Sequence, residues 1–211
     1  YEVRLALGVI SHGFIHSEEG GLYTEADFMD AYKDDRSQDI LREKVTLLHC
    51  TTEYPAPLED INLSAMDTLS KEFGLPVGYS DHSEGISVSL AAVAKGARII
   101  EKHFTLDRSM EGPDHSASLE PGELKTMIES IRSIELALGD GVKRLMPSEI
   151  QNRDVARKSI LASRRIEKGE TFSSDSICVK RPGNGLSPIH YWSLLGTQAV
   201  TTFEEGDLIV V

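Results

Sequence analysis

Between residues 45 and 139, short apolar runs alternate with longer segments in which apolar residues recur at helical spacing. A short apolar, β-branched run is typical of a strand buried on both faces, and the wider spacing is typical of an amphipathic helix. The predicted strands are residues 45–51, 76–80 and 97–104. The predicted helices are residues 62–73, 86–96 and 123–139. Because the two kinds of element alternate through short connections, the sequence predicts βαβ units and a parallel sheet, as in α/β proteins.

The residues before this region have a different pattern. Residues 1–44 predict helices, with a glycine-rich break at residues 18–21. Thr24 precedes a segment with acidic residues in its first turn. This arrangement favours a helix N-cap at the threonine, because the positive end of the helix dipole then faces the acidic side chains.

The pattern changes again after Gly139, where the sequence becomes polar and then shows short β-like runs separated by the turn sequences EKGE and PGNG. We therefore predict a partial α/β domain at residues 1–140, a linker at 141–156 and a small, mostly β module at 157–211. A module of about 55 residues is near the lower size limit for independent stability. We expect it to pack against another domain or another chain.

Composition narrows the class of function. The chain has 22 basic and 34 acidic residues, a net charge of −12, which argues against a nucleic acid or an anionic membrane surface as the main partner. No apolar run approaches the ~20 residues that cross a bilayer, and no signal peptide opens the sequence. Cys50 and Cys178 are far apart within apolar runs, which fits a reducing compartment. We expect a cytoplasmic protein in which Cys50 is a small buried hydrophobe rather than a nucleophile.

Two predicted strand ends carry a histidine. His82 follows strand 76–80, and His103 is in the last part of strand 97–104. The carboxyl ends of parallel strands meet at one edge, where α/β proteins bind ligands, and neighbouring strands lie ~4.8 Å apart. Two neutral imidazoles at this spacing suit a shared Mn, Fe, Co or Zn ion with open coordination positions. The alternative is that each histidine is hydrogen-bonded at its strand end and has a structural role.

Five motifs carry a resemblance to a known family. In chain order they are HCTTEYPAP, GYSDHSEG, IIEKHFTLDR, GPDHSASL and KRPGNG. Their order and spacing resemble those of the N-acetylneuraminate (sialic acid) synthase family, and the segments EVRLALGV and LREKVTLLHCTTEYPAP most resemble its legionaminic acid synthase branch. The resemblance covers nearly the whole chain after residue 44.

The resemblance implies a (β/α)8 TIM barrel followed by a small antifreeze-like (SAF) β module. This sequence supplies about three strand–helix units where the barrel has eight, and it begins at Tyr1 rather than methionine. The first strands of the barrel, with their phosphate-binding lysines, are not among these units. We therefore expect an N-terminally truncated chain, the C-terminal part of the barrel followed by the SAF module.

The family reaction condenses phosphoenolpyruvate with an N-acetylated mannosamine-type sugar and yields a nine-carbon 2-keto acid and phosphate. By resemblance, His82 and His103 bind the divalent cation that polarises the sugar aldehyde. The expected ion is Mn²⁺, with Mg²⁺ and Co²⁺ as alternatives. The sequence leaves open whether the sugar is N-acetylmannosamine or a 2,4-diacetamido-trideoxymannose.

The resemblance also assigns catalytic and substrate-binding residues. Asp114 and Tyr54 are expected in catalysis, Asp114 by orienting sugar hydroxyls or by moving the proton when water adds to C2 of the intermediate. The expected substrate-binding residues are Thr52, Tyr54, Ser80, Asp114 and Arg181. Thr52 and Ser80 would donate to the carboxylate or phosphate of phosphoenolpyruvate. Taken alone, Asp114 is a turn residue in a Gly-Pro loop and Tyr54 is a packing residue.

Three further residues have expected supporting roles. In the family, the arginine that Arg181 matches reaches the N-acetyl group in the partner subunit's site, so the resemblance implies a domain-swapped homodimer. Glu101 and Lys102 precede His103 on the same predicted strand. Because neighbouring side chains on a strand point to opposite faces, only one of this pair shares the face of the histidine, and both are expected to support the metal site from nearby.

Two other classes of function stay open from the sequence. One is a non-catalytic chain whose role is binding or dimerisation, or which supplies half of a two-chain barrel. The other is a different metal-dependent α/β aldolase that shares only the two histidines. The RPGNG motif and the trailing β module argue against this last class.

Overall fold

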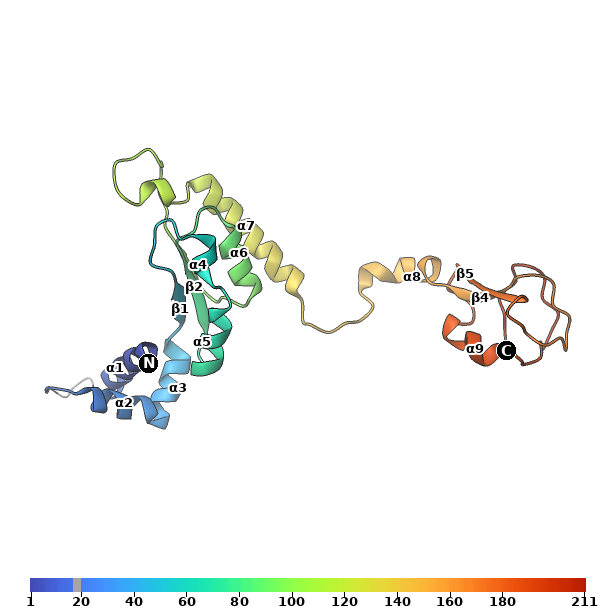
Figure 1. Ribbon diagram of the computed structural model, residues 1–211, viewed down its shortest axis with the longest axis horizontal. Coiled ribbons are helices and arrows are strands. Elements are labelled where there is room, and N and C mark those ends of the chain that lie inside the picture. The colour runs from blue at the N-terminus through green and yellow to red at the C-terminus, as the bar shows by residue number, and fades with distance from the viewer. Residues whose placement is uncertain (17–19) are drawn as a thin grey trace. The chain divides into compact units, whose positions relative to one another are not determined.

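The computed structural model describes residues 1–16 and 20–211, so residues 18 and 19 of the predicted glycine-rich break lie outside the described residues. The chain divides into two compact units, Tyr1–Gly141 and Val142–Val211 (Figure 1). Among the helices of the described residues, none is long and apolar enough to span a membrane.

Three parallel strands form the sheet of the first unit, in the order β1–β2–β3. They are β1 (Leu47–Cys50), β2 (Val77–Asp81) and β3 (Ile100–Lys102). Cys50 pairs with Ser80, and Ser80 pairs with Glu101, so the three strands end at the same edge. The prediction of adjacent parallel strands is confirmed.

The first three helices that follow these strands share an apolar core with them, and the fourth packs against the third. In order, these helices are α4 (Leu58–Ile61), α5 (Ala65–Phe73), α6 (Ser87–Ala94) and α7 (Pro121–Leu138). Tyr79 of β2 is fully buried and belongs to one core cluster with Met66 of α5 and Ala92 of α6. The predicted helix at residues 62–73 is observed as α5, from Ala65 to Phe73. It begins three residues later than predicted, because Asn62 adopts a left-handed conformation with φ of 48° that ends the preceding α4.

Three helices precede the sheet: α1 (Glu2–Ile15), α2 (Glu25–Lys33) and α3 (Asp35–Lys44). They pack against one another at the end of the sheet where β1 begins (Figure 1). Leu7 and Leu41 of these helices form a buried cluster with Leu75, which lies just before β2. Thr24 caps α2 as predicted, since its hydroxyl accepts from the Asp27 amide and the Asp27 carboxylate accepts from the Thr24 amide.

The second unit is built on an antiparallel pair, β4 (Ser159–Ala162) and β5 (Ile177–Lys180). Ile160, Phe172 and Phe203 are members of its apolar core. Its helices are α8 (Ile150–Ala156) and α9 (Tyr191–Leu194), and it also has the short 3₁₀ turns η2 (Pro147–Glu149) and η3 (Pro188–His190). A further 3₁₀ turn, η1 (His115–Ala117), lies in the first unit. Part of the segment expected as a linker is therefore helical.

Candidate functional site at the carboxyl ends of the strands

The ends of β2 and β3 bring functional side chains to one face of the sheet. Side chains alternate along a strand, so Ser80 and His82 share a face, as do Glu101 and His103. The rings of His82 and His103 are 5.5 Å apart between centroids, in an edge-to-face arrangement. The predicted juxtaposition of the two histidines is observed.

The backbone fixes the tautomer of His82. This residue is only 9% exposed, and its Nδ1 lies 2.7 Å from the backbone oxygen of Thr51. Because a carbonyl oxygen only accepts hydrogen bonds, Nδ1 carries the proton, and Nε2 of the neutral ring keeps its lone pair. Nε2 lies 3.1 Å from the Tyr54 hydroxyl and 3.4 Å from the Ser80 hydroxyl. His82 therefore presents an acceptor nitrogen at the strand ends.

Tyr54 contacts both histidines. Its ring stacks on His82 with centroids 4.1 Å apart and lies 4.9 Å from the ring of His103. Burial raises the pKa of the Tyr54 phenol, and nearby acidic groups, Cys50 and Asp114 among them, raise this pKa further. The phenol therefore stays protonated and is able to donate to His82 or to a ligand.

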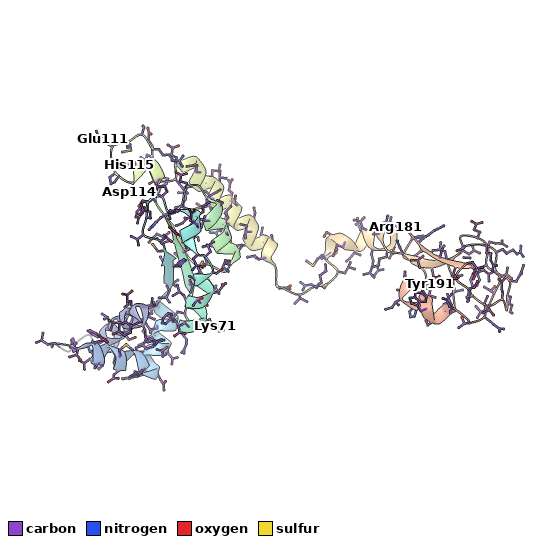
Figure 2. The ribbon with its side chains drawn as sticks, viewed as in Figure 1. Lys71, Glu111, Asp114, His115, Arg181 and Tyr191 are labelled. Atoms are coloured by element: carbon purple, nitrogen blue, oxygen red, sulfur yellow. The ribbon has the colours of Figure 1, made fainter. Side chains whose placement is uncertain are left out.

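Asp114 lies in the loop after β3, close to His103. Its Oδ2 is 3.9 Å from Nδ1 of His103, which is beyond direct hydrogen-bond reach. The loop is anchored just after the carboxylate, because His115 forms a 2.7 Å hydrogen bond with the Thr105 hydroxyl and the Ser118 hydroxyl donates to the Asp114 carbonyl. Figure 2 shows Asp114 beside His115 in this loop. An exposed carboxylate is thus held near the histidines.

Ser80 donates its hydroxyl proton to Glu101, with 2.6 Å between the two oxygens. Glu101 is therefore a member of the same side-chain group as the histidines, a more direct position than the sequence predicted. The two-residue spacing between Glu101 and His103 is the signal that places them on one face. The predicted donation from Ser80 to a phosphate requires its hydroxyl to turn away from Glu101.

Lys102 and Asp81 form an ion pair on the opposite face of the strands. Their charged atoms are 3.1 Å apart, and the side chains are 3% and 0% exposed. Asp81 also accepts hydrogen bonds from the hydroxyls of Ser83 and Ser89, and Lys102 donates to the Ser83 carbonyl. Lys102 thus supports the strand ends from behind and does not face the histidines.

The prediction that Cys50 is buried is wrong. Cys50 is exposed because it is the last residue of β1 and, through its pairing with Ser80, points to the face of the histidines rather than into the core. Its sulfur lies 3.7 Å from Nδ1 of His82. The apolar run that ends at Cys50 gave no indication of which face its last side chain occupies.

Two predicted substrate-binding residues are outside this group of contacts. Thr52 is exposed in the loop that follows β1. Arg181 belongs to the second unit, where its Nε donates to the carbonyl of Ala156 at 3.0 Å.

The orientation of the His82 ring is the feature that fits a divalent metal site. The described residues contain no group of three or more His, Cys, Asp or Glu side chains placed to hold an ion. His82, however, presents Nε2 while a backbone carbonyl orients its Nδ1–H, which is how proteins usually position a metal-binding imidazole. His103 adds a second imidazole, and Asp114 adds a carboxylate beside it. This donor set suits an ion such as Mn²⁺ that keeps open positions.

Comparison with known proteins gives the context of these residues. Residues 10–143 match the NeuB family, and residues 157–210 match the SAF domain. The N,N'-diacetyllegionaminic acid synthase of Campylobacter jejuni is 54% identical over 168 residues, which are 80% of this chain and 50% of that protein. The N-acetylneuraminate-9-phosphate synthase of Homo sapiens is 41% identical over 172 residues, 81% of this chain and 48% of that protein.

A solved structure is similar as well. The N-acetylneuraminic acid (sialic acid) synthetase of Leptospira borgpetersenii, in complex with citrate, matches with a TM-score of 0.53 and 34% identity, over 71% of this chain and 53% of that chain. The chain spans about half the length of the curated relatives it matches.

Proposed function

The chain belongs to the NeuB family, and from this premise we propose that its residues form part of the active site of a sialic acid-type synthase. The first unit is part of a TIM-barrel-type domain and the second contains a SAF domain, as the sequence predicted. The proposed reaction condenses phosphoenolpyruvate with an N-acetylated mannosamine-type sugar. The observation that supports it most directly is the group formed by Tyr54, His82, His103 and Asp114 at one edge of the sheet.

The proposed reaction forms one carbon–carbon bond and releases phosphate. C3 of phosphoenolpyruvate bonds to the aldehyde carbon of the open-chain sugar, water adds at C2, and the bond from C2 to the phosphate oxygen breaks. We assign His82 and His103 as the residues that would hold a divalent cation. Mn²⁺ is the expected ion, with Mg²⁺ and Co²⁺ as alternatives, and neutral imidazole suits the two transition metals better than Mg²⁺. When bound, such an ion supplies Lewis acidity toward the sugar aldehyde.

The side chains around the histidines handle the protons and the substrate oxygens. In this proposal the neutral Tyr54 phenol donates a hydrogen bond to a substrate oxygen. Asp114 accepts from sugar hydroxyls or takes the proton of the water that adds at C2. Ser80 and Thr52 donate to the carboxylate or phosphate of phosphoenolpyruvate, Ser80 after exchanging its bond to Glu101.

The proposed role of the SAF domain depends on Arg181. We propose that this arginine binds the N-acetyl oxygen of the sugar from the partner subunit of a domain-swapped homodimer. A guanidinium has several N–H donors, and the bond to the Ala156 carbonyl uses one of them. The free state of both cysteines agrees with a cytoplasmic location for this enzyme.

A second candidate function is binding without catalysis. The observation that favours it is the SAF domain at residues 157–210, which belongs to a compact unit with its own apolar core. In that case the SAF domain would serve dimerisation, or the first unit would supply half of a two-chain barrel.

A coupled phosphate-release assay distinguishes these functions. The protein as its gene encodes it is incubated with phosphoenolpyruvate, Mn²⁺ and either N-acetylmannosamine or 2,4-diacetamido-trideoxymannose. Synthase activity requires phosphate release that depends on one of the sugars, is lost in Asp114→Asn and is kept in Glu111→Gln, a control in the same loop (Figure 2). Absence of sugar-dependent release in the wild-type protein would favour the binding function.

A further inference from the structure

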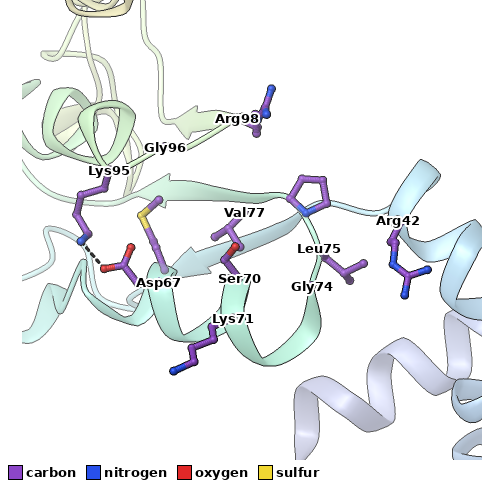
Figure 3. Close-up of a pocket in the computed structure, with 12 residues that line it drawn as sticks. Arg42, Asp67, Ser70, Lys71, Gly74, Leu75, Val77, Lys95, Gly96 and Arg98 are labelled. Carbon is purple, nitrogen blue, oxygen red and sulfur yellow. Dashed lines mark hydrogen bonds and ion pairs between the residues drawn. The ribbon is translucent and has the colours of Figure 1, made fainter. Parts of the chain in front are cut away.

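A basic pocket lies at the opposite end of the strands from the histidines. It has a volume of about 740 Å³, and its charged lining residues are Arg42, Asp67, Lys71, Lys95 and Arg98 (Figure 3). The pocket also includes Leu75 and Pro76, which come just before β2, whereas His82 follows β2. At about 3.3 Å per strand residue, the length of β2 separates the two places by more than ~13 Å. In Figure 2, Lys71 and Asp114 are accordingly far apart within the first unit.

Two of the four basic side chains of this pocket have acidic partners. Lys95 pairs with Asp67 at 2.6 Å, and Arg42 pairs with Asp39 at 2.8 Å. Their charges are neutralised locally, so they leave little surplus for a ligand.

The other two basic side chains, Lys71 and Arg98, have no such partner. Among the described residues of the first unit, every other lysine and arginine has an ion pair or a ring contact, and these two have neither of these nor a side-chain hydrogen bond. Both line the same pocket, in a chain whose net charge is −12. Two uncompensated cations in one hollow give it a potential opposite in sign to the net charge of the protein.

The helix dipole explains why a cation occurs at Lys71 but not why one occurs at Arg98. Lys71 is in the last turn of α5, where a cation stabilises the negative end of the helix dipole. Arg98 is outside any helix, shortly before β3, so the dipole gives no reason for it. The two helices that end at the pocket, α5 and α6, contribute roughly −0.5 of a charge each, which is less than the two unpaired positive charges.

We propose that the basic pocket binds a phosphate-bearing small molecule at a site separate from the proposed active site. Guanidinium and ammonium groups are the usual side-chain partners of phosphate. The volume is within the range of about 300–1,000 Å³ typical of small-molecule sites. Gly74 and Gly96 line the pocket with open space where a Cβ would be, so no side chain narrows it at these two positions. Their amides donate to the carbonyls of Ser70 and Val93, so Lys71 and Arg98 are the proposed partners of the phosphate.

Titration of the chain with ribose 5-phosphate, followed by amide NMR, tests this site without reference to turnover. We expect shifts of the Gly74 and Gly96 amides with ribose 5-phosphate and none with ribose. In Lys71→Ala/Arg98→Ala, the dissociation constant should rise about tenfold or more, because two charge-assisted contacts are lost.

A matched control removes the same charge elsewhere. Lys125→Ala/Arg132→Ala deletes two cations of α7 that are paired with glutamates, and it should keep the affinity. Equal weakening in both double variants would overturn the site, because the effect would then come from net charge alone. Where the first double variant fails to fold by circular dichroism, the wild-type titration decides: shifts absent at Gly74 and Gly96, or confined to residues around His82, would also overturn it.

Discussion

The ammonium of Lys102 lies 3.1 Å from the carboxylate of Asp81, and both side chains are almost completely buried. Asp81 immediately precedes His82, and Lys102 immediately precedes His103. The pair therefore joins β2 to β3 directly behind the two histidines. Its hydrogen bonds to Ser83 and Ser89 extend this link to the loop after β2 and to α6.

Breaking this pair should destabilise the first unit strongly. In Lys102→Met the buried carboxylate of Asp81 loses its counter-charge, and we expect a loss of about 3–5 kcal/mol in the free energy of unfolding. The exposed pair of Lys125 with Glu129 is the control, and Lys125→Met should cost less than about 1 kcal/mol. Urea denaturation of the two variants measures both, and comparable losses would contradict the importance assigned to the buried pair.

The buried hydroxyl of Tyr79 leads to a second prediction, in which the stability of the fold depends on pH. Tyr79 is fully buried, its hydroxyl has no hydrogen-bond partner among the described residues, and burial raises the pKa of Tyr79 to about 12. Because the folded pKa exceeds the unfolded value of about 10, the unfolded state loses its proton first as pH rises. The associated stability is complete below pH ~10 and should fall by roughly 2–3 kcal/mol between pH ~10 and ~12.

Tyr79→Phe isolates this effect. The variant removes an unpaired buried hydroxyl, so at neutral pH it should be as stable as the wild type or more stable by about 1 kcal/mol. The difference between the two proteins should grow above pH ~10, because the wild type alone has this titration. A variant that is less stable than the wild type at neutral pH, by denaturant titration, would mean that the hydroxyl has a partner in solution.

The sequence predicted the architecture better than it predicted side-chain contacts. The apolar runs were sufficient for β1, β2 and β3, and parallel pairing alone brought His82 and His103 to one edge. The exposure of Cys50 was missed, because burial at a strand end depends on what covers that face rather than on the run itself. The late start of the predicted helix, at Ala65, depends on the backbone conformation of Asn62, which its neighbours do not signal.

The contacts of Tyr54 and Glu101 illustrate the same limit. That Tyr54 stacks on His82, or that Glu101 accepts from Ser80, depends on rotamers and on loop conformation. Hydrophobic periodicity contains no information on either. Strand alternation supplied the face of Glu101 but not its partner.

Tyr54→Phe separates the two contributions of this tyrosine. The ring that stacks on His82 is kept, and the hydroxyl 3.1 Å from Nε2 is removed. Under the proposed function we expect kcat to fall about 100-fold or more, with stability changed by less than about 1 kcal/mol. Steady-state kinetics measures the split between kcat and KM. A variant with an unchanged kcat would assign Tyr54 to packing alone.

The two histidines give the last prediction, which concerns metal dependence. In the protein as its gene encodes it, His82→Ala or His103→Ala should abolish metal-dependent phosphate release, because each variant removes one imidazole of the proposed ion site. The cost in stability should be within about 0.5–3 kcal/mol, as for most single substitutions, so lost turnover and lost folding are distinguishable by circular dichroism. Direct titration with Mn²⁺, followed by its paramagnetic resonance signal, should show weaker binding in both variants and unchanged binding in His190→Ala, whose imidazole belongs to the second unit. A His82→Ala enzyme that keeps near-normal turnover after treatment with a chelator would contradict the metal assignment, and the hydrogen bonds of His82 to Thr51 and Tyr54 would then be its whole role.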